Sequence, residues 1–302
     1  MDDFRNDTVE DFIPVTGGKA WYKIIGRNKK KTPLLMLHGG PGATHDYLEP
    51  LHTLSNDRPV IFYDQLGCGN SEQPQDPSLW TLERSVEELS QIRTALKLQT
   101  IHLLGTSWGT MLAIEYILTK QPSGIASMIL SGPCLSVSRW IADQRAYLRQ
   151  LPAHAQSAVA VAEERGIYDS KEYQDAVMLY YKLHVCRLEP WPDCLQKTFA
   201  RINSTIYTKM WGPSEFTCTG TLKDYERAHD LHKINIPTLF LAGRYDEARP
   251  VTTAYYQTML PGSILRIIED ASHTHFLEKT NECLSAMRDF LSGFDKIGRD
   301  NP

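Results

Sequence analysis

Residues 101–119 read IHLLGTSWGTMLAIEYILT, and this stretch decides the fold. An apolar run typical of a buried strand enters Gly105-Thr106-Ser107-Trp108-Gly109, and an apolar helical pattern follows at once. A serine between such a strand and helix is held on a tight turn, with its hydroxyl projecting above the sheet. The glycines two positions to either side let strand and helix approach closely. The context, more than the pentapeptide, therefore predicts that Ser107 is a nucleophile.

Further apolar runs flank this stretch and alternate with helical patterns. Most are continuously apolar, which is typical of strands covered on both faces. The alternation predicts a mostly parallel sheet with helices on both faces. A helix is expected over 82–96 and another over 280–292, since their apolar residues recur at steps of three and four. The expected strands are AWYKIIG (20–26), PLLMLH (33–38), PVIFYD (59–64), IHLLG (101–105), SMILSG (127–132), PTLFLAG (237–243) and ILRIIED (264–270).

The alternation stops near residue 134 and resumes near residue 223. The intervening segment is helical in tone, with SAVAVAEERG and KEYQDAVMLYYKLHVC as examples. We interpret 134–222 as a helical cap and assign 1–133 and 223–302 to the core. Ligands of open α/β sheets bind at the carboxyl ends of the strands, so a cap over those ends would shape a substrate site.

A glycine turn follows an earlier expected strand, in the sequence His38-Gly39-Gly40-Pro41-Gly42. Acyl transfer needs N–H donors aimed at the oxygen of a tetrahedral intermediate, and a glycine turn exposes such groups. We expect the donors to be the backbone N–H groups of Gly39 and Trp108. We expect His38 to support this turn without titrating in the reaction.

The acid and the base of a triad are expected after the last two strands. PTLFLAG runs into Asp246, and ILRIIED runs into the segment that contains His273. The order serine, acid, histidine is that of the α/β-hydrolase fold, so we predict Ser107, Asp246 and His273 as the catalytic triad of a serine hydrolase. Glu247 remains an alternative acid and His275 an alternative base.

Composition excludes several other classes of protein. The chain has 302 residues, 42% of them apolar, with 32 Lys and Arg against 36 Asp and Glu. The small net charge of −4 argues against nucleic acid or a membrane surface as the main partner. Neither a metal nor a cofactor is implied. The acidic N-terminus and the absence of zinc-like spacing indicate a cytoplasmic protein with free thiols at Cys68, Cys134, Cys186, Cys194, Cys218 and Cys283.

Five segments resemble the proline iminopeptidases, and among them the tricorn-interacting aminopeptidase factor and the related L-amino acid amidases. The likeness covers nearly the whole chain and is weakest over 135–205. It implies release of an N-terminal residue, proline or another small or hydrophobic one, from a short peptide or amino-acid amide. The segments are LHGGPGATHDYL (37–48), FYDQLGCGNSEQP (62–74), GTSWGT (105–110), WGPSEFTCTGTLKDY (211–225) and GRYDEARP (243–250).

The resemblance also implies how the free amine is recognised. In these enzymes acidic groups pair with the substrate ammonium, and the matching positions are Glu215 and Glu247. Two carboxylates satisfy the donors of an ammonium well. Cys68 also matches the family pattern, on a loop expected near the site. Further residues expected to contact substrate are Gly40, Trp108, Trp211 and Tyr245.

Two other functions remain open at this point. An esterase or lactonase of the same fold would have no use for a free amine, and Glu215 and Glu247 would then be dispensable. A binding protein that keeps the fold without turnover would be expected to have lost a member of the triad. Composition and motifs leave the oligomeric state open.

Overall fold

The computed structural model describes residues 7–295, so both ends of the expected core, and part of the acidic N-terminus, lie outside it. Eight strands form one sheet in the order β1-β2-β4-β3-β5-β6-β7-β8. Strands β3 to β8 run parallel, whereas β1 and β2 are antiparallel. The strands are β1 (Thr8–Val15), β2 (Gly18–Ile25), β3 (Leu34–Leu37), β4 (Val60–Tyr63), β5 (Ile101–Thr106), β6 (Ile125–Ser131), β7 (Thr238–Gly243) and β8 (Ile264–Ile268).

The mostly parallel sheet is confirmed, and each of the seven predicted strands is present. Strand β1 was not predicted. It is an edge strand paired only with β2, and most of its residues are exposed or half-buried. A strand with so little buried surface lacks the continuous apolar run by which the other strands are recognised.

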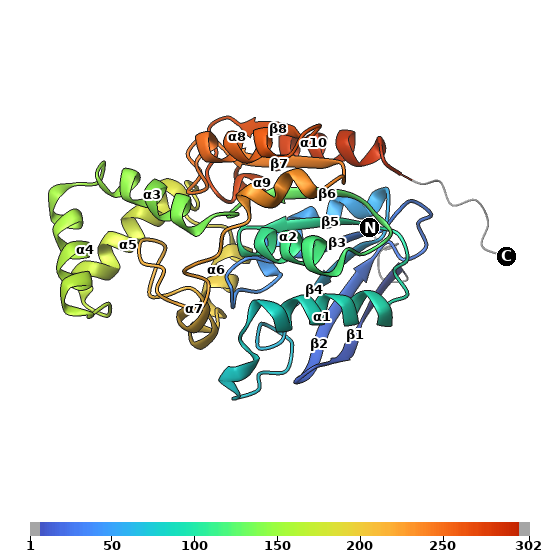
Figure 1. Ribbon diagram of the computed structural model, residues 1–302, viewed down its shortest axis with the longest axis horizontal. Helices are drawn as coiled ribbons and strands as arrows, with labels where there is room; N and C mark the ends of the chain where they lie inside the picture. Colours follow the sequence, from blue (N-terminus) through green and yellow to red (C-terminus); the bar gives the residue numbers. More distant parts are fainter. Residues whose placement is uncertain (1–6, 296–302) are drawn as a thin grey trace.

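Helices cover both faces of the sheet, as predicted (Figure 1). Strand β3 shows how one segment serves two cores, since Leu35 and Leu37 enter one cluster while Leu34 and Met36 enter the other. The first face carries α1 (Leu82–Ala95), α2 (Trp108–Lys120) and α8 (Pro250–Met259). The second carries the 3-10 segment η2 (Asp46–Asn56), α9 (His275–Glu278) and α10 (Thr280–Ser292).

Five helices are inserted between β6 and β7. They are α3 (Val137–Leu148), α4 (Ala153–Arg165), α5 (Lys171–His184), α6 (Asp193–Ala200) and α7 (Ser204–Met210). Helices α3, α4 and α5 extend sideways beyond the sheet (Figure 1). They bury a cluster of their own, which contains Tyr147, Tyr173, Tyr180 and Phe216.

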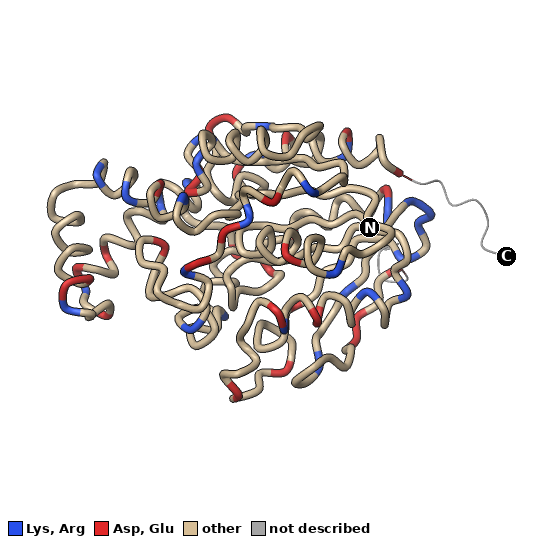
Figure 2. Tube along the Cα trace, in the orientation of Figure 1, with Lys and Arg blue, Asp and Glu red and all other residues tan. Residues whose placement is uncertain are grey.

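Charged residues of both signs are spread over the sheet, its covering helices and the inserted helices alike (Figure 2). Two short 3-10 segments, η3 (Pro77–Leu79) and η4 (Ala228–Lys233), complete the connections. Among the helices of residues 7–295, none is both long and apolar enough to cross a membrane.

Candidate active site

Ser107 occupies a strained turn between β5 and α2. Its φ of 52° lies in the left-handed region that non-glycine residues rarely adopt. The flanking glycines permit the close approach on which this turn depends. A Cβ on Gly105 would lie 2.4 Å from the Gly109 carbonyl oxygen, and a Cβ on Gly109 would lie 2.2 Å from that of Leu37. The turn therefore requires glycine at both positions.

The glycine turn after β3 lies beside this serine. The Gly39 N–H donates to the Tyr47 hydroxyl at 2.8 Å, and that hydroxyl is also hydrogen-bonded to Thr106 Oγ1. The Gly39 amide, expected to face the reacting oxygen, therefore already has an acceptor within the protein. The structure differs from this expectation because η2 places the Tyr47 hydroxyl beside the glycine turn. Gly40 follows, and it lines both of the hollows that meet at Ser107.

His38 supports this turn as a neutral side chain. Its Nε2 accepts the Gln65 backbone N–H at 3.0 Å, so the ring proton resides on Nδ1, which donates to the Gly39 carbonyl at 2.9 Å. Complete burial lowers the pKa of His38, which favours the same neutral form. Gln65 extends the arrangement, because its Oε1 accepts the Trp108 indole N–H at 2.9 Å. The turn and the start of α2 are thereby joined.

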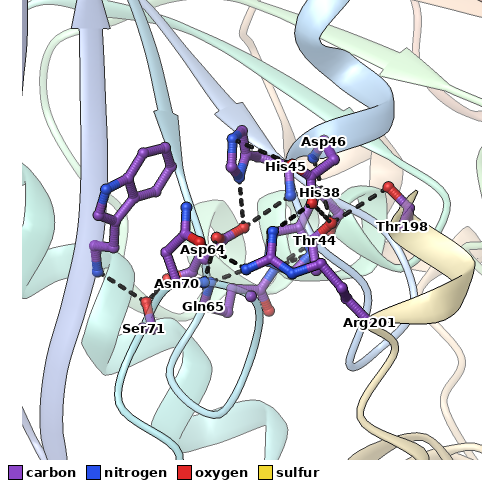
Figure 3. A network of polar contacts seen from close by, with 12 residues as sticks. His38, Thr44, His45, Asp46, Asp64, Gln65, Asn70, Ser71, Thr198 and Arg201 are labelled. Atoms are coloured by element: carbon purple, nitrogen blue, oxygen red, sulfur yellow. Dashed lines mark hydrogen bonds and ion pairs between the residues drawn. The ribbon is translucent and has the colours of Figure 1, made fainter. Parts of the chain in front are cut away.

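A buried polar network continues from the glycine turn toward α6 (Figure 3). Asp64 Oδ1 accepts the His45 backbone N–H at 2.7 Å and contacts the His45 ring at 2.9 Å. Asp46 Oδ2 accepts from Thr44 Oγ1 at 2.6 Å and from Arg201 Nη1 at 2.8 Å. Because Arg201 follows α6, this network joins the segment after the glycine turn to the inserted helices at the edge of the site.

Asp246 and His273 meet at the ends of β7 and β8. The His273 Nδ1 lies 2.7 Å from Asp246 Oδ1, and the Asp246 carboxylate also accepts the backbone N–H groups of Ala248 at 2.8 Å and Gly243 at 3.2 Å. Burial acts to raise the pKa of Asp246, but the charges and hydrogen bonds of His273 and His275 outweigh it and lower the pKa to about 2. Asp246 is therefore ionised and holds the imidazole by its Nδ1.

His275, the alternative base, lies elsewhere. It is completely buried, its Nε2 is 2.8 Å from Ser131 Oγ, and its Nδ1 is 3.2 Å from the Ser272 carbonyl. It is not among the residues lining the cavity at Ser107, whereas His273 is. The geometry thus favours His273 over His275 as the base.

Two hollows of different size meet at Ser107. The larger has a volume of about 380 Å³, and Ser107, His273, Glu215 and Glu247 all line it. The smaller, of about 10 Å³, has a largely aromatic and apolar wall. That wall comprises Trp108, Met111, Cys134, Trp140 and Trp211, with Gly40, Ser107 and Glu215 completing the lining.

The two carboxylates predicted from the family resemblance both lie in this site. Glu215, half-buried, accepts the Tyr207 hydroxyl at 2.5 Å. Glu247 is 3% exposed, and its Oε1 lies 3.5 Å from His273 Nε2. Burial raises the pKa of both side chains, and for Glu247 the negative charge of Glu215 raises it further. A cation that binds beside these two carboxylates in the cavity would therefore be strongly stabilised.

Two predicted residues line neither hollow. Tyr245 is 38% exposed, beneath the guanidinium of Arg187, and it lines neither hollow. The prediction that it forms a pocket wall is therefore wrong. Cys68 is buried beside Trp108, and burial raises the pKa of its thiol well above the ordinary value. Its thiol is neither exposed nor ionised.

Sequence reasoning missed two residues that contribute to the site. Trp140 on α3 lines the small hollow, and its ring lies edge-on to His273 with 6.3 Å between the centroids. Tyr207 on α7 holds Glu215 in place. Both belong to the inserted helices, where the only available signal was an aromatic residue in an amphipathic helix, which ordinarily indicates core packing.

Comparisons with known proteins identify the family of this chain. Residues 32–280 match the family model described as alpha/beta hydrolase fold. The chain is 46% identical to the proline iminopeptidase of Heyndrickxia coagulans over 284 residues, which are 94% of this chain and 98% of that one. It is 38% identical to that of Lactobacillus acidophilus over 293 residues, 96% of this chain and 100% of the relative.

Solved structures agree as well. The crystal structure of VinJ superimposes with a TM-score of 0.91 at 32% identity, over 95% of this chain and 99% of that one. The proline iminopeptidase of Mycobacterium smegmatis gives 0.86 at 32% identity, over 95% and 98%. This chain is an α/β-hydrolase and a serine hydrolase. Within that class it belongs to the proline iminopeptidase family.

Proposed function

We propose that this enzyme releases an N-terminal residue, proline first among the candidates, from short peptides or amino-acid amides through an acyl-enzyme. The observation that carries the proposal is the presence of Glu215 and Glu247 in the same cavity as Ser107 and His273. An exopeptidase must hold the free amine one residue from the scissile bond. Two carboxylates beside the nucleophile supply the acceptors for that purpose.

The small aromatic hollow is proposed to take the side chain of the released residue. The Trp140 and Trp211 rings line it and lie edge to face with centroids 5.9 Å apart. The volume of this hollow, about 10 Å³, is close to that needed for one water molecule, so the wall must move outward to admit even a compact ring such as that of proline. The larger hollow then accepts the rest of the peptide, which becomes the leaving amine.

The reaction follows from the triad. His273 removes the Ser107 proton as the hydroxyl attacks the carbonyl carbon, and Asp246 stabilises the imidazolium that forms. His273 then protonates the leaving amine, and water hydrolyses the acyl-enzyme. We assign the oxyanion donors to the Trp108 N–H, in the first turn of α2, and to the Gly40 N–H. Gly40 replaces Gly39 in this role because the Gly39 amide already donates to Tyr47.

We further propose that residues 134–222 act as a cap over the core formed by 1–133 and 223–302. The support is that Glu215, Trp140 and Trp211 all come from this segment and line the hollows. A cytoplasmic location is proposed from the six cysteines, all of which are free thiols.

The test compares p-nitroanilides of proline, alanine, leucine and phenylalanine, each with a free and an N-acetylated amine. We expect turnover of the free-amine substrates only, with proline preferred, and loss of turnover in the Ser107→Ala variant. Equal turnover of acetylated substrates would instead indicate a general serine esterase or amidase. A fluorophosphonate that failed to label Ser107 would indicate a protein without turnover.

A further inference from the structure

Both nitrogens of the catalytic imidazole face carboxylates. Nδ1 lies 2.7 Å from Asp246 Oδ1, and Nε2 lies 3.5 Å from Glu247 Oε1. A neutral imidazole has only one N–H, whereas an imidazolium presents both nitrogens as donors. This arrangement therefore suits the charged ring. Nε2 is also the atom that must be free of its proton to act as a base toward Ser107.

Glu247 has a second oxygen that the protein does not satisfy. Within residues 7–295, its buried Oε2 has no hydrogen-bond partner, and the side chain lines the cavity at Ser107. Leaving a buried carboxylate oxygen without a donor destabilises the protein. The remaining acceptor therefore points to a cationic donor that arrives with the ligand.

The charges around His273 and Glu247 are few and mostly negative. Asp246, Glu247 and Glu215 face His273, while His275 contacts the other oxygen of Asp246 at 3.7 Å. The titratable groups that also act on Glu247 are the hydroxyls of Tyr180 and Tyr181 on α5, the Tyr207 hydroxyl on α7 and the Cys134 thiol. Because burial and the charge of Glu215 raise the pKa of Glu247, its ionised form depends on a facing cation, which in the unliganded site is His273.

We propose that the ammonium of the substrate activates the catalytic base: by pairing with Glu247 it replaces His273 there and expels the proton from Nε2. The inference rests on the proposed aminopeptidase function, since it gives the amine-binding carboxylate a second role. The ammonium keeps all its protons, and the Nε2 proton passes through the cavity to water. One positive charge enters and one leaves. Neutral Nε2 is then available to Ser107.

The acid–base properties of the site agree with this order of events. Burial acts to lower the pKa of His273, but Asp246 and Glu247 outweigh it and raise the pKa to about 9. The empty site therefore holds an imidazolium at neutral pH, which is inactive as a base. A substrate cation beside Glu247 repels the imidazolium and lowers its pKa. Free-amine selectivity would then appear in kcat as well as in KM.

A direct test uses the Ser107→Ala variant and nuclear magnetic resonance of the His273 ring between pH 5 and 10. The titration is recorded alone, with L-prolinamide, and with cyclopentanecarboxamide, which has the same ring size without the amine. We expect prolinamide to lower the His273 pKa by at least one unit and cyclopentanecarboxamide to leave it in place. Prolinamide that binds without moving this titration would overturn the inference alone. Prolinamide that does not bind would overturn the proposed function as well.

A kinetic test uses cyclopentanecarboxylic acid p-nitroanilide against proline p-nitroanilide. We expect Glu247→Gln to raise kcat on the amine-free substrate about tenfold at pH 7. The acidic limb of the kcat–pH profile for this substrate should also move to lower pH. The same variant should lower turnover of the prolyl substrate. Glu163→Gln is the matched control, because Glu163 is a carboxylate of α4 that pairs with Arg145 and lines neither hollow. An amine-free kcat that does not rise in Glu247→Gln, or rises equally in Glu163→Gln, contradicts the proposal.

Discussion

Replacing Gly109 by alanine tests the geometry of the nucleophile turn. The new Cβ would lie 2.2 Å from the Leu37 carbonyl oxygen, whereas ordinary contact begins at 3.4 Å. Helix α2 and strand β3 must therefore separate by about 1.2 Å, because neither atom belongs to a flexible side chain. Ser107 lies two residues away on the same helix terminus and has to move with it.

This displacement has two measurable consequences. A misplacement of about 1 Å in a catalytic group reduces turnover roughly a hundredfold, so we expect that loss in kcat/KM on proline p-nitroanilide. Overpacking of a well-packed core costs about 1–3 kcal/mol of unfolding free energy. Helix propensity acts in the opposite direction, since alanine exceeds glycine by about 1 kcal/mol in a helix interior. A net loss of stability in urea would therefore identify the steric clash as its cause.

Gly293→Ala is the matched control. Its φ of −69° suits any residue, and its nearest Cβ contact would be 3.5 Å. We expect its stability to remain within about 0.5 kcal/mol of the parent protein. The reasoning would be refuted by a Gly109→Ala enzyme that keeps kcat/KM within about threefold of the parent and unfolds at the same urea concentration.

Two further predictions concern the acyl pocket and the ion pair of the triad. Trp140→Ala should enlarge the small hollow, so that the ratio of kcat/KM for phenylalanine over proline p-nitroanilide rises about tenfold or more; an unchanged ratio would exclude this hollow as the acyl pocket. Asp246→Asn should cost stability most between pH 4 and 6.5. Asp246, with a folded pKa of about 2, contributes stability above its unfolded pKa of 3.8 and loses it as the pH falls toward 2. His273, with a folded pKa of about 9, contributes below its unfolded pKa of 6.5 and loses it as the pH rises through 9. Urea unfolding of both proteins at pH 5, 7 and 9.5 measures the difference, and a constant difference across that range would contradict the assignment.

Local pattern was sufficient to predict most of the core. Runs such as PLLML and IHLLG are apolar throughout because the strands are covered on both faces, and this property is readable without any tertiary information. The order of Ser107, Asp246 and His273 along the chain was informative for the same reason, since each follows a recognisable strand. Strand β1 escaped prediction because Glu10 and Asp11 interrupt its apolar residues, whereas the other edge strand, β8, keeps a mostly apolar run.

Only the tertiary structure decided which way the side chains point and which distant segments of the chain come into contact. The sequence alone determined the strands, the glycine turns and the chemical types at the site. It could not show that Tyr47 returns to accept the Gly39 amide, or that Tyr245 points outward while its neighbour Asp246 is buried. Nor could it show that Glu247 Oε1 lies 3.5 Å from Nε2 of His273. These features depend on contacts between distant segments, whose energies are set by packing and burial and not by any local periodicity.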